Sequence, residues 1–128
     1  MRIADLLAEN AMTTDEMKAR TRAFSLRIIK LVEAMPSGRT ADVIGKQLLR
    51  SGTSVGANYR AACRAKSNAD FIAKMGIVEE EADESAFWSD LIVESGLMKK
   101  ELVEPLMNEA NQLVAMTVAS INTARGHK

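Results

Sequence analysis

The sequence is poor in the residues on which disulfides, strands and histidine chemistry depend. Its 128 residues include one cysteine, one histidine, two prolines and only 4% aromatic residues. The single cysteine, Cys63, cannot form a disulfide within the chain, which agrees with a reducing compartment. Because strand-forming residues are few while Ala, Leu, Met, Glu and Lys are plentiful, we expect an all-α fold.

Long hydrophobic runs are absent as well. No apolar segment approaches the ~18–20 residues that a membrane-spanning helix needs. An acidic residue also interrupts the N-terminal stretch in which a signal peptide would carry its apolar core. We therefore expect no membrane association and a cytoplasmic location. With 47% apolar and 27% charged residues, the chain has the composition of a single folded domain.

The net charge is zero, but the charges are unevenly distributed. Residues 14–66 carry eleven Lys and Arg against four Asp and Glu, whereas residues 67–128 carry five against eleven. A bundle that places these two halves side by side would cancel much of the field. The asymmetry therefore favours helix pairing or subunit contact over nucleic-acid binding.

Apolar residues recur at helical spacing in four segments, at residues 17–35, 44–62, 71–92 and 102–124. Short connections between helices of similar length favour antiparallel neighbours. The sequence thus predicts an antiparallel up-down-up-down four-helix bundle over residues 13–125. Residues 1–12 are expected to form a short arm, helical in part, that lies on the surface or contacts a subunit, and residues 126–128 to fray.

Several residues predict where the helices begin. Thr13 followed by Glu16 has the pattern of a capping box, and Thr40 and Ser67 are candidate N-caps of the next two helices. Pro105 fits the last helix only if it lies in the first turn.

Two glycines, Gly52 and Gly56, fall in the middle of the second predicted helix. Each costs roughly 1 kcal/mol there relative to Ala. Close approach of a neighbouring helix is the usual compensation, and we expect it here.

Three segments of the sequence have a familiar pattern: residues 47–58 (QLLRSGTSVGAN), 66–71 (KSNADF) and 81–88 (EADESAFW). Together they resemble the family named for proteins encoded in intervening sequences of 23S ribosomal RNA genes. The resemblance covers roughly residues 17–123. It depends on the joint spacing of Arg-Ser-x-x-Ser-x-x-x-Asn in one helix and Glu-x-x-Glu-x-x-x-Trp in the next. It implies a left-handed up-down bundle that forms a ring, commonly a homopentamer, without an established enzymatic activity.

The chain is also similar to accessory proteins of diversity-generating retroelements, which are basic pentameric bundles thought to bind reverse transcriptase and nucleic acid. It differs from them in its zero net charge. It differs again after Asn58, where many family members carry an acid two residues on and this chain has Arg60. A function that depends on that acid is therefore not implied.

The helical positions of the motif residues predict a polar network between the second and third helices. One stripe carries an arginine and two small polar residues, and the other carries two glutamates. If the stripes face each other, the arginine fork forms a partly buried ion pair with the carboxylates. A structural network that fixes helix register is favoured over a ligand pocket or a catalytic carboxylate pair. The predicted network consists of Arg50, Ser54, Asn58, Glu81 and Glu84.

Candidate catalytic and metal sites are weak. A di-iron bundle needs Glu-x-x-His pairs, and the only histidine is His127 in the tail. Cys63 has no histidine base and is interpreted as a buried structural thiol. Because Gly52 and Gly56 lie within a helix, there is no phosphate-binding glycine loop. We therefore expect no enzymatic activity, no metal and no cofactor.

A set of basic residues forms a candidate phosphate-contacting surface, with solvated helix faces as the alternative interpretation. These residues are Lys18, Arg20, Arg22, Arg27, Arg60 and Arg64. No interleaved aromatic residues provide a stacking platform for single strands.

The leading hypothesis is a non-enzymatic, self-assembling interaction module, and the alternative is an RNA- or DNA-binding accessory protein associated with ribosomal RNA or reverse transcriptase. Helices one, three and four carry apolar residues beside their main stripes, more than one bundle core requires. They are Leu26, Ile29, Val32, Ile77, Trp88, Leu91, Val103, Met107, Val114 and Val118. From these residues we expect more than one copy, and the resemblance implies five.

Overall fold

The computed structural model describes residues 13–126, and this part of the chain is helical without any strand. The four helices are α2 (Thr14–Glu33), α3 (Arg39–Ala62), α4 (Asn68–Glu94) and α5 (Lys100–Gly126). The predicted all-α fold and four-helix bundle are confirmed. Residues 1–12, which we expected to form an arm, lie outside the described residues, as do residues 127–128 of the predicted frayed tail. Gly126, also assigned to that tail, is the last residue of α5.

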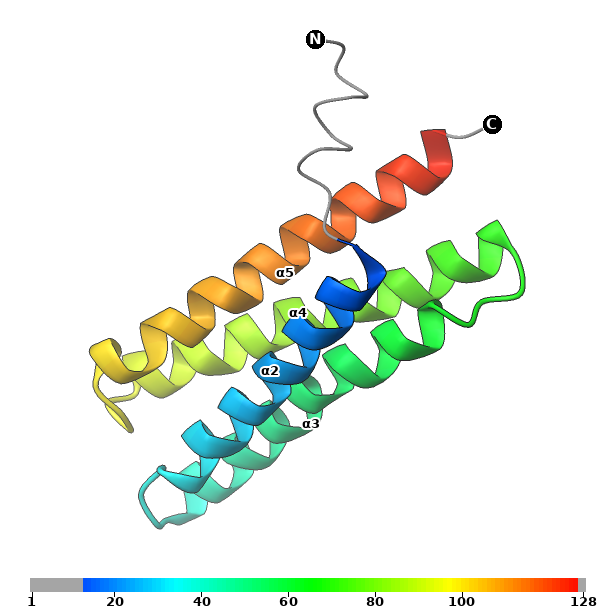
Figure 1. Cartoon of the computed structure of the whole chain (residues 1–128). Coiled ribbons are helices and arrows are strands. Elements are labelled where there is room, and N and C mark those ends of the chain that lie inside the picture. Colours follow the sequence, from blue (N-terminus) through cyan, green and yellow to red (C-terminus); the bar gives the residue numbers. More distant parts are fainter. Residues whose placement is uncertain (1–12, 127–128) are drawn as a thin grey trace, which may run out of the picture.

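Each helix packs along the helix that precedes it, whereas α2 touches α5 over a much smaller area. The three connections, residues 34–38, 63–67 and 95–99, can each reach at most ~18 Å. Helices of this length are ~30–40 Å long, so a short connection forces the next helix to turn back. Figure 1 shows each helix returning beside the one before it. The handedness of the bundle stays a prediction.

Two of the three predicted N-caps are present. The Thr13 hydroxyl accepts the Glu16 backbone N–H at 3.1 Å, and the Glu16 carboxylate accepts the Thr13 backbone N–H at 3.0 Å, which completes the capping box. Ser67 likewise accepts a backbone N–H three residues on. The prediction for Thr40 was wrong, because α3 begins at Arg39 and its N-cap is Gly38, without a side-chain cap. Gly38 has a φ of 150°, where a side chain would be strained, so the chain turns there and Thr40 is already helical.

The expected position of Pro105 was also wrong. Because α5 begins at Lys100, Pro105 lies in the second turn. Its missing N–H leaves the carbonyl of Glu101 without a helical partner. Glu101 is exposed, so water can satisfy that carbonyl.

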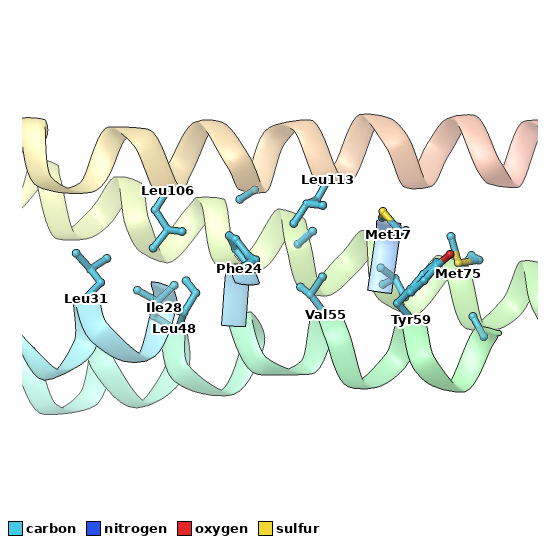
Figure 2. Close-up of a cluster of buried hydrophobic side chains, with 14 of the residues drawn as sticks. Met17, Phe24, Ile28, Leu31, Leu48, Val55, Tyr59, Met75, Leu106 and Leu113 are labelled. Carbon is cyan, nitrogen blue, oxygen red and sulfur yellow. The ribbon is translucent and has the colours of Figure 1, made fainter. Parts of the chain in front are cut away.

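The core is a continuous column of apolar side chains from all four helices (Figure 2). At the start of α5 the expected core residue was wrong. The predicted apolar stripe begins at Leu102, but Leu102 is 60% exposed, whereas Val103, expected beside the stripe, is fully buried. The physical reason is the poor contact between α2 and α5, which leaves a groove at this end lined by Lys30, Ala34 and Leu102. An apolar residue that faces this groove has no helix to cover it.

Close packing between α2 and α3 explains a glycine in the middle of α3. A Cβ added to Gly52 would lie 2.6 Å from Cγ1 of Ile28. A Cβ on Gly56 would lie 3.4 Å from the backbone oxygen of Thr21. The close approach of a neighbouring helix that the sequence predicts is therefore present between α2 and α3, and it is closest at Gly52.

Candidate functional site

The predicted ion-pair residues meet on the surface between α3 and α4. Arg50 donates from Nη1 to Glu81 Oε2 at 3.0 Å and from Nη2 to Oε2 of Glu84. The indole N–H of Trp88 donates to the same Glu84 oxygen at 3.0 Å. Glu84 is thus held by a cation from α3 and by an aromatic residue of its own helix.

This ion pair is buried on one side only. The Glu81 side chain is 15% exposed, but that of Arg50 is 49% exposed. Arg50 follows the buried Leu48 by two residues, which turns it to the outside of α3. Since solvent screens exposed ion pairs, this pair joins two helices only weakly and is not a deeply buried charge.

The other two residues of the predicted network do not reach the carboxylates. The Ser54 hydroxyl donates to the backbone oxygen of Arg50 at 2.6 Å, and the Asn58 amide donates to the backbone oxygen of Ser54 at 2.8 Å. Both bonds stay within α3. Within the described residues, neither side chain forms a hydrogen bond with Glu81 or Glu84.

A polar contact that sequence reasoning missed lies directly beneath the ion pair. Ser51 and Ser85 are fully buried, and their hydroxyls lie 3.1 Å apart between α3 and α4. Their small size lets the two helices approach. Both serines lie in the apolar stripes that predict the core. A polar residue at such a position is the feature of the sequence that could have indicated this contact.

The six basic residues of the predicted phosphate-contacting surface separate into four places. Lys18 and Arg22 from α2 and Arg60 from α3 line one groove of about 460 Å³ between these helices. Arg27 lies in a different groove, beside the start of α5. Arg64 is exposed just beyond the end of α3. Only three of the six residues therefore converge.

Arg20, the sixth, is committed to a contact within the chain. Its Nε and Nη2 atoms donate to the two carboxylate oxygens of Glu109 on α5, both at 2.7 Å, and Nη2 also donates to Gln112 at 2.7 Å. These hydrogen bonds to Glu109 raise the pKa of the Arg20 guanidinium above its usual value. Arg20 therefore joins α2 to α5 and does not lie with the three cations of the groove. Its partner lies 89 residues away, which no local pattern indicates.

The apolar excess is smaller than the sequence suggested, and it is differently placed. Of the ten residues expected beside the main stripes, Leu26, Ile29 and Ile77 are exposed, while Val103 belongs to the core and the others are half-buried. Phe87, which was not predicted, is 53% exposed. Its ring packs edge-to-face on Trp88, with centroids 5.0 Å apart.

Tyr59 and Cys63 lie together at the end of the bundle where α3 stops. Burial, together with the nearby thiol, raises the pKa of Tyr59 to about 12. Cys63 is half-buried, less than the buried thiol that we expected.

Metal and membrane features can be assessed over the same part of the chain. Among residues 13–126, no cluster of three or more His, Cys, Asp or Glu residues is arranged to hold a metal ion. None of the four helices is long and apolar enough to cross a membrane.

Comparisons with known proteins agree on one family. Residues 14–119 match the model of the 23S rRNA-intervening sequence protein family. A crystal structure of a protein of unknown function from the S23 ribosomal protein family of Bacteroides thetaiotaomicron is 33% identical and superposes with a TM-score of 0.80. That match covers 87% of this chain and 99% of the other. No match was found among curated proteins. With most of the described bundle matched, the chain belongs to the family of 23S rRNA-intervening sequence proteins.

Proposed function

We propose that this protein is a non-enzymatic interaction module that acts as a ring of identical copies. The observation that carries the proposal is a pair of exposed apolar surfaces with opposite charges around them. One surface lies on α4 and the other on α2. Neither is covered by another helix of the described bundle.

The α4 surface is centred on Phe87. Glu80, Asp83 and Asp90 lie seven residues before, four before and three after it, so that all four share the outer side of the helix. All are exposed. An exposed phenylalanine surrounded by carboxylates has the composition of an interface centre with a polar rim.

The α2 surface is centred on Leu26 and Ile29, which are 51% and 39% exposed. Arg22 precedes Leu26 by four residues, and Lys30 follows it by four. Both cations are exposed. This surface therefore has an apolar centre, as the α4 surface does, but its two cations outnumber the one acid of its rim, Glu33, which lies four residues after Ile29.

Complementary surfaces on opposite sides of one chain favour head-to-tail contact. The acidic rim of one copy would meet the basic rim of the next, while Phe87 packs on Leu26 and Ile29. Such a contact repeats around an axis, and closing the ring leaves no unpaired surface at an end. We take five copies from the family resemblance.

The contacts of the carboxylate pair support a role without catalysis. Glu81 and Glu84 both bind Arg50, and Glu84 also accepts the Trp88 N–H. These hydrogen bonds use Oε2 of each carboxylate and join two helices, which is a structural role for the pair.

Matched substitutions to glutamate test the interface. Leu26→Glu and Phe87→Glu should each reduce the particle mass measured by light scattering after size exclusion. The control Leu102→Glu places the same charge on another exposed leucine, outside both surfaces, and should retain the wild-type mass. If all three variants keep the wild-type mass, the proposed contact is wrong.

An RNA- or DNA-binding accessory role is the second candidate function. It is favoured by the α2–α3 groove, where Lys18, Arg22 and Arg60 converge and no acid is among the lining residues. Binding of a labelled RNA that weakens with added salt would support it.

A further inference from the structure

The groove between α2 and α3 is built from small residues and rimmed by cations. Gly56 and Ala57 supply its α3 side, and Ser25 lies opposite on α2. A Cβ on Gly56 would already touch the Ser25 hydroxyl at 3.4 Å. The floor is therefore close to the backbone, and the Ser25 hydroxyl donates to the backbone oxygens of Thr21 and Gly52 at 3.2 and 3.3 Å.

The three cations of the groove have no acidic partner in the described chain. Lys18 and Arg22 lie one turn apart on α2, and Arg60 faces them from α3. None of the salt bridges within residues 13–126 involves them. Arg20 and Arg50, by contrast, each bind carboxylates. Like charges around one hollow repel each other, and a bound anion would relieve that repulsion.

We propose that this groove binds phosphate groups, through Arg22 and Arg60 as planar forks and Lys18 as a point charge. Its volume of about 460 Å³ exceeds that of a single phosphate and lies in the range of small-ligand sites, ~300–1,000 Å³. A nucleic-acid backbone and a small phosphorylated molecule both present such a phosphate, and the test below distinguishes them. The lining contains no aromatic side chain on which a base could stack. Recognition is accordingly of phosphate and not of base sequence.

This inference deepens the second candidate function and shares Arg22 with the proposed contact between copies. The groove occupies the first half of α2, and the apolar pair Leu26 and Ile29 follows it in the second half. The variants chosen below leave Arg22 in place, because it also borders the apolar pair. Particle mass therefore serves as a check that each variant is folded and assembled like the wild type.

The test compares two double variants that each remove one lysine and one arginine. Lys18→Ala with Arg60→Ala empties the groove of two cations, and Lys46→Ala with Arg39→Ala removes the same charges from exposed positions elsewhere. Binding of a labelled single-stranded RNA is followed by anisotropy at two salt concentrations. Inorganic phosphate is added as competitor, and its own binding to each variant is measured by calorimetry.

For three phosphate contacts, RNA affinity should fall roughly 20-fold between about 50 and about 200 mM salt, and only about 3-fold for the groove variant, which keeps one contact. At the lower salt concentration, the groove variant should bind at least about tenfold more weakly than the control variant. Phosphate that binds the groove while RNA does not would assign a small ligand and reject the nucleic-acid function. RNA that binds equally to both variants would contradict phosphate binding by this groove but not the nucleic-acid-binding function. Binding of neither RNA nor phosphate would contradict both proposals.

Discussion

The contact between Gly52 and Ile28 allows a sharp prediction about the packing of α2 on α3. Gly52→Ala adds a methyl group that would lie 2.6 and 2.8 Å from Cγ1 and Cγ2 of Ile28. These atoms are attached to a β-branched carbon, which has little rotational freedom in a helix. Overpacking of this kind costs ~1–3 kcal/mol.

The same substitution at Gly76 provides the control. Gly76 lies in the middle of α4, and a Cβ there would meet nothing within 4 Å. Both variants gain the helix propensity of alanine, ~1 kcal/mol, so the difference between them isolates the steric cost. We expect Gly76→Ala to melt above the wild type and Gly52→Ala to melt below Gly76→Ala by roughly 3–15 °C.

Thermal unfolding followed by circular dichroism, at one fixed protein concentration, measures this difference. In the Gly52→Ala background, Ile28→Ala should destabilise less than the ~2–5 kcal/mol expected in the wild type, because it removes the clashing atoms. Equal melting temperatures for the two glycine variants would refute the close approach of α2 and α3.

Three further predictions follow from single side chains. The protein has one tyrosine, so an ultraviolet titration should give a midpoint near the pKa of about 12 for Tyr59, raised by burial and the nearby thiol. Because the fold favours the neutral phenol, its contribution to stability is present below the unfolded pKa of ~10 and is lost as the pH rises through the folded value. A native midpoint near the unfolded pKa would contradict this. Arg20→Ala should lower the free energy of unfolding by ~1–3 kcal/mol in urea titrations, since Glu109 loses the two hydrogen bonds from the guanidinium. Arg20→Lys should recover only part of this stability, and full recovery would show that the two-pronged contact is not needed. Arg50→Ala should leave the midpoint of the urea titration almost unchanged because Arg50 is half exposed, and a large shift would show that its pair is effectively buried.

Features set by neighbouring residues were predictable from the sequence. The capping box at Thr13 and the cap at Ser67 depend on residues three positions away. The apolar period identified all four helices and most of the core for the same reason. The meeting of Arg50 with Glu81 and Glu84 was predicted only on the condition that their two stripes face each other, which depends on how α3 packs on α4.

Features set by the packing of distant segments could not be predicted from the sequence. Leu102 and Val103 are equally apolar neighbours, and only the weak contact between α2 and α5 decides which of them is buried. Arg20 and Arg22 are likewise equivalent in sequence. One reaches Glu109 on α5 and the other lines the groove with α3, a difference that depends on how α2 lies against its two neighbours.

The particle mass in solution tests the central proposal of self-assembly most directly. Light scattering or sedimentation of the wild-type chain at about 10 µM gives the mass without reference to shape. Because assembly depends on protein concentration, the measurement is made at this fixed concentration, at which we expect the ring to be formed. Five copies of a 14.0 kDa chain predict a particle of about 70 kDa. A single stable species of 14.0 kDa under these conditions would contradict the account.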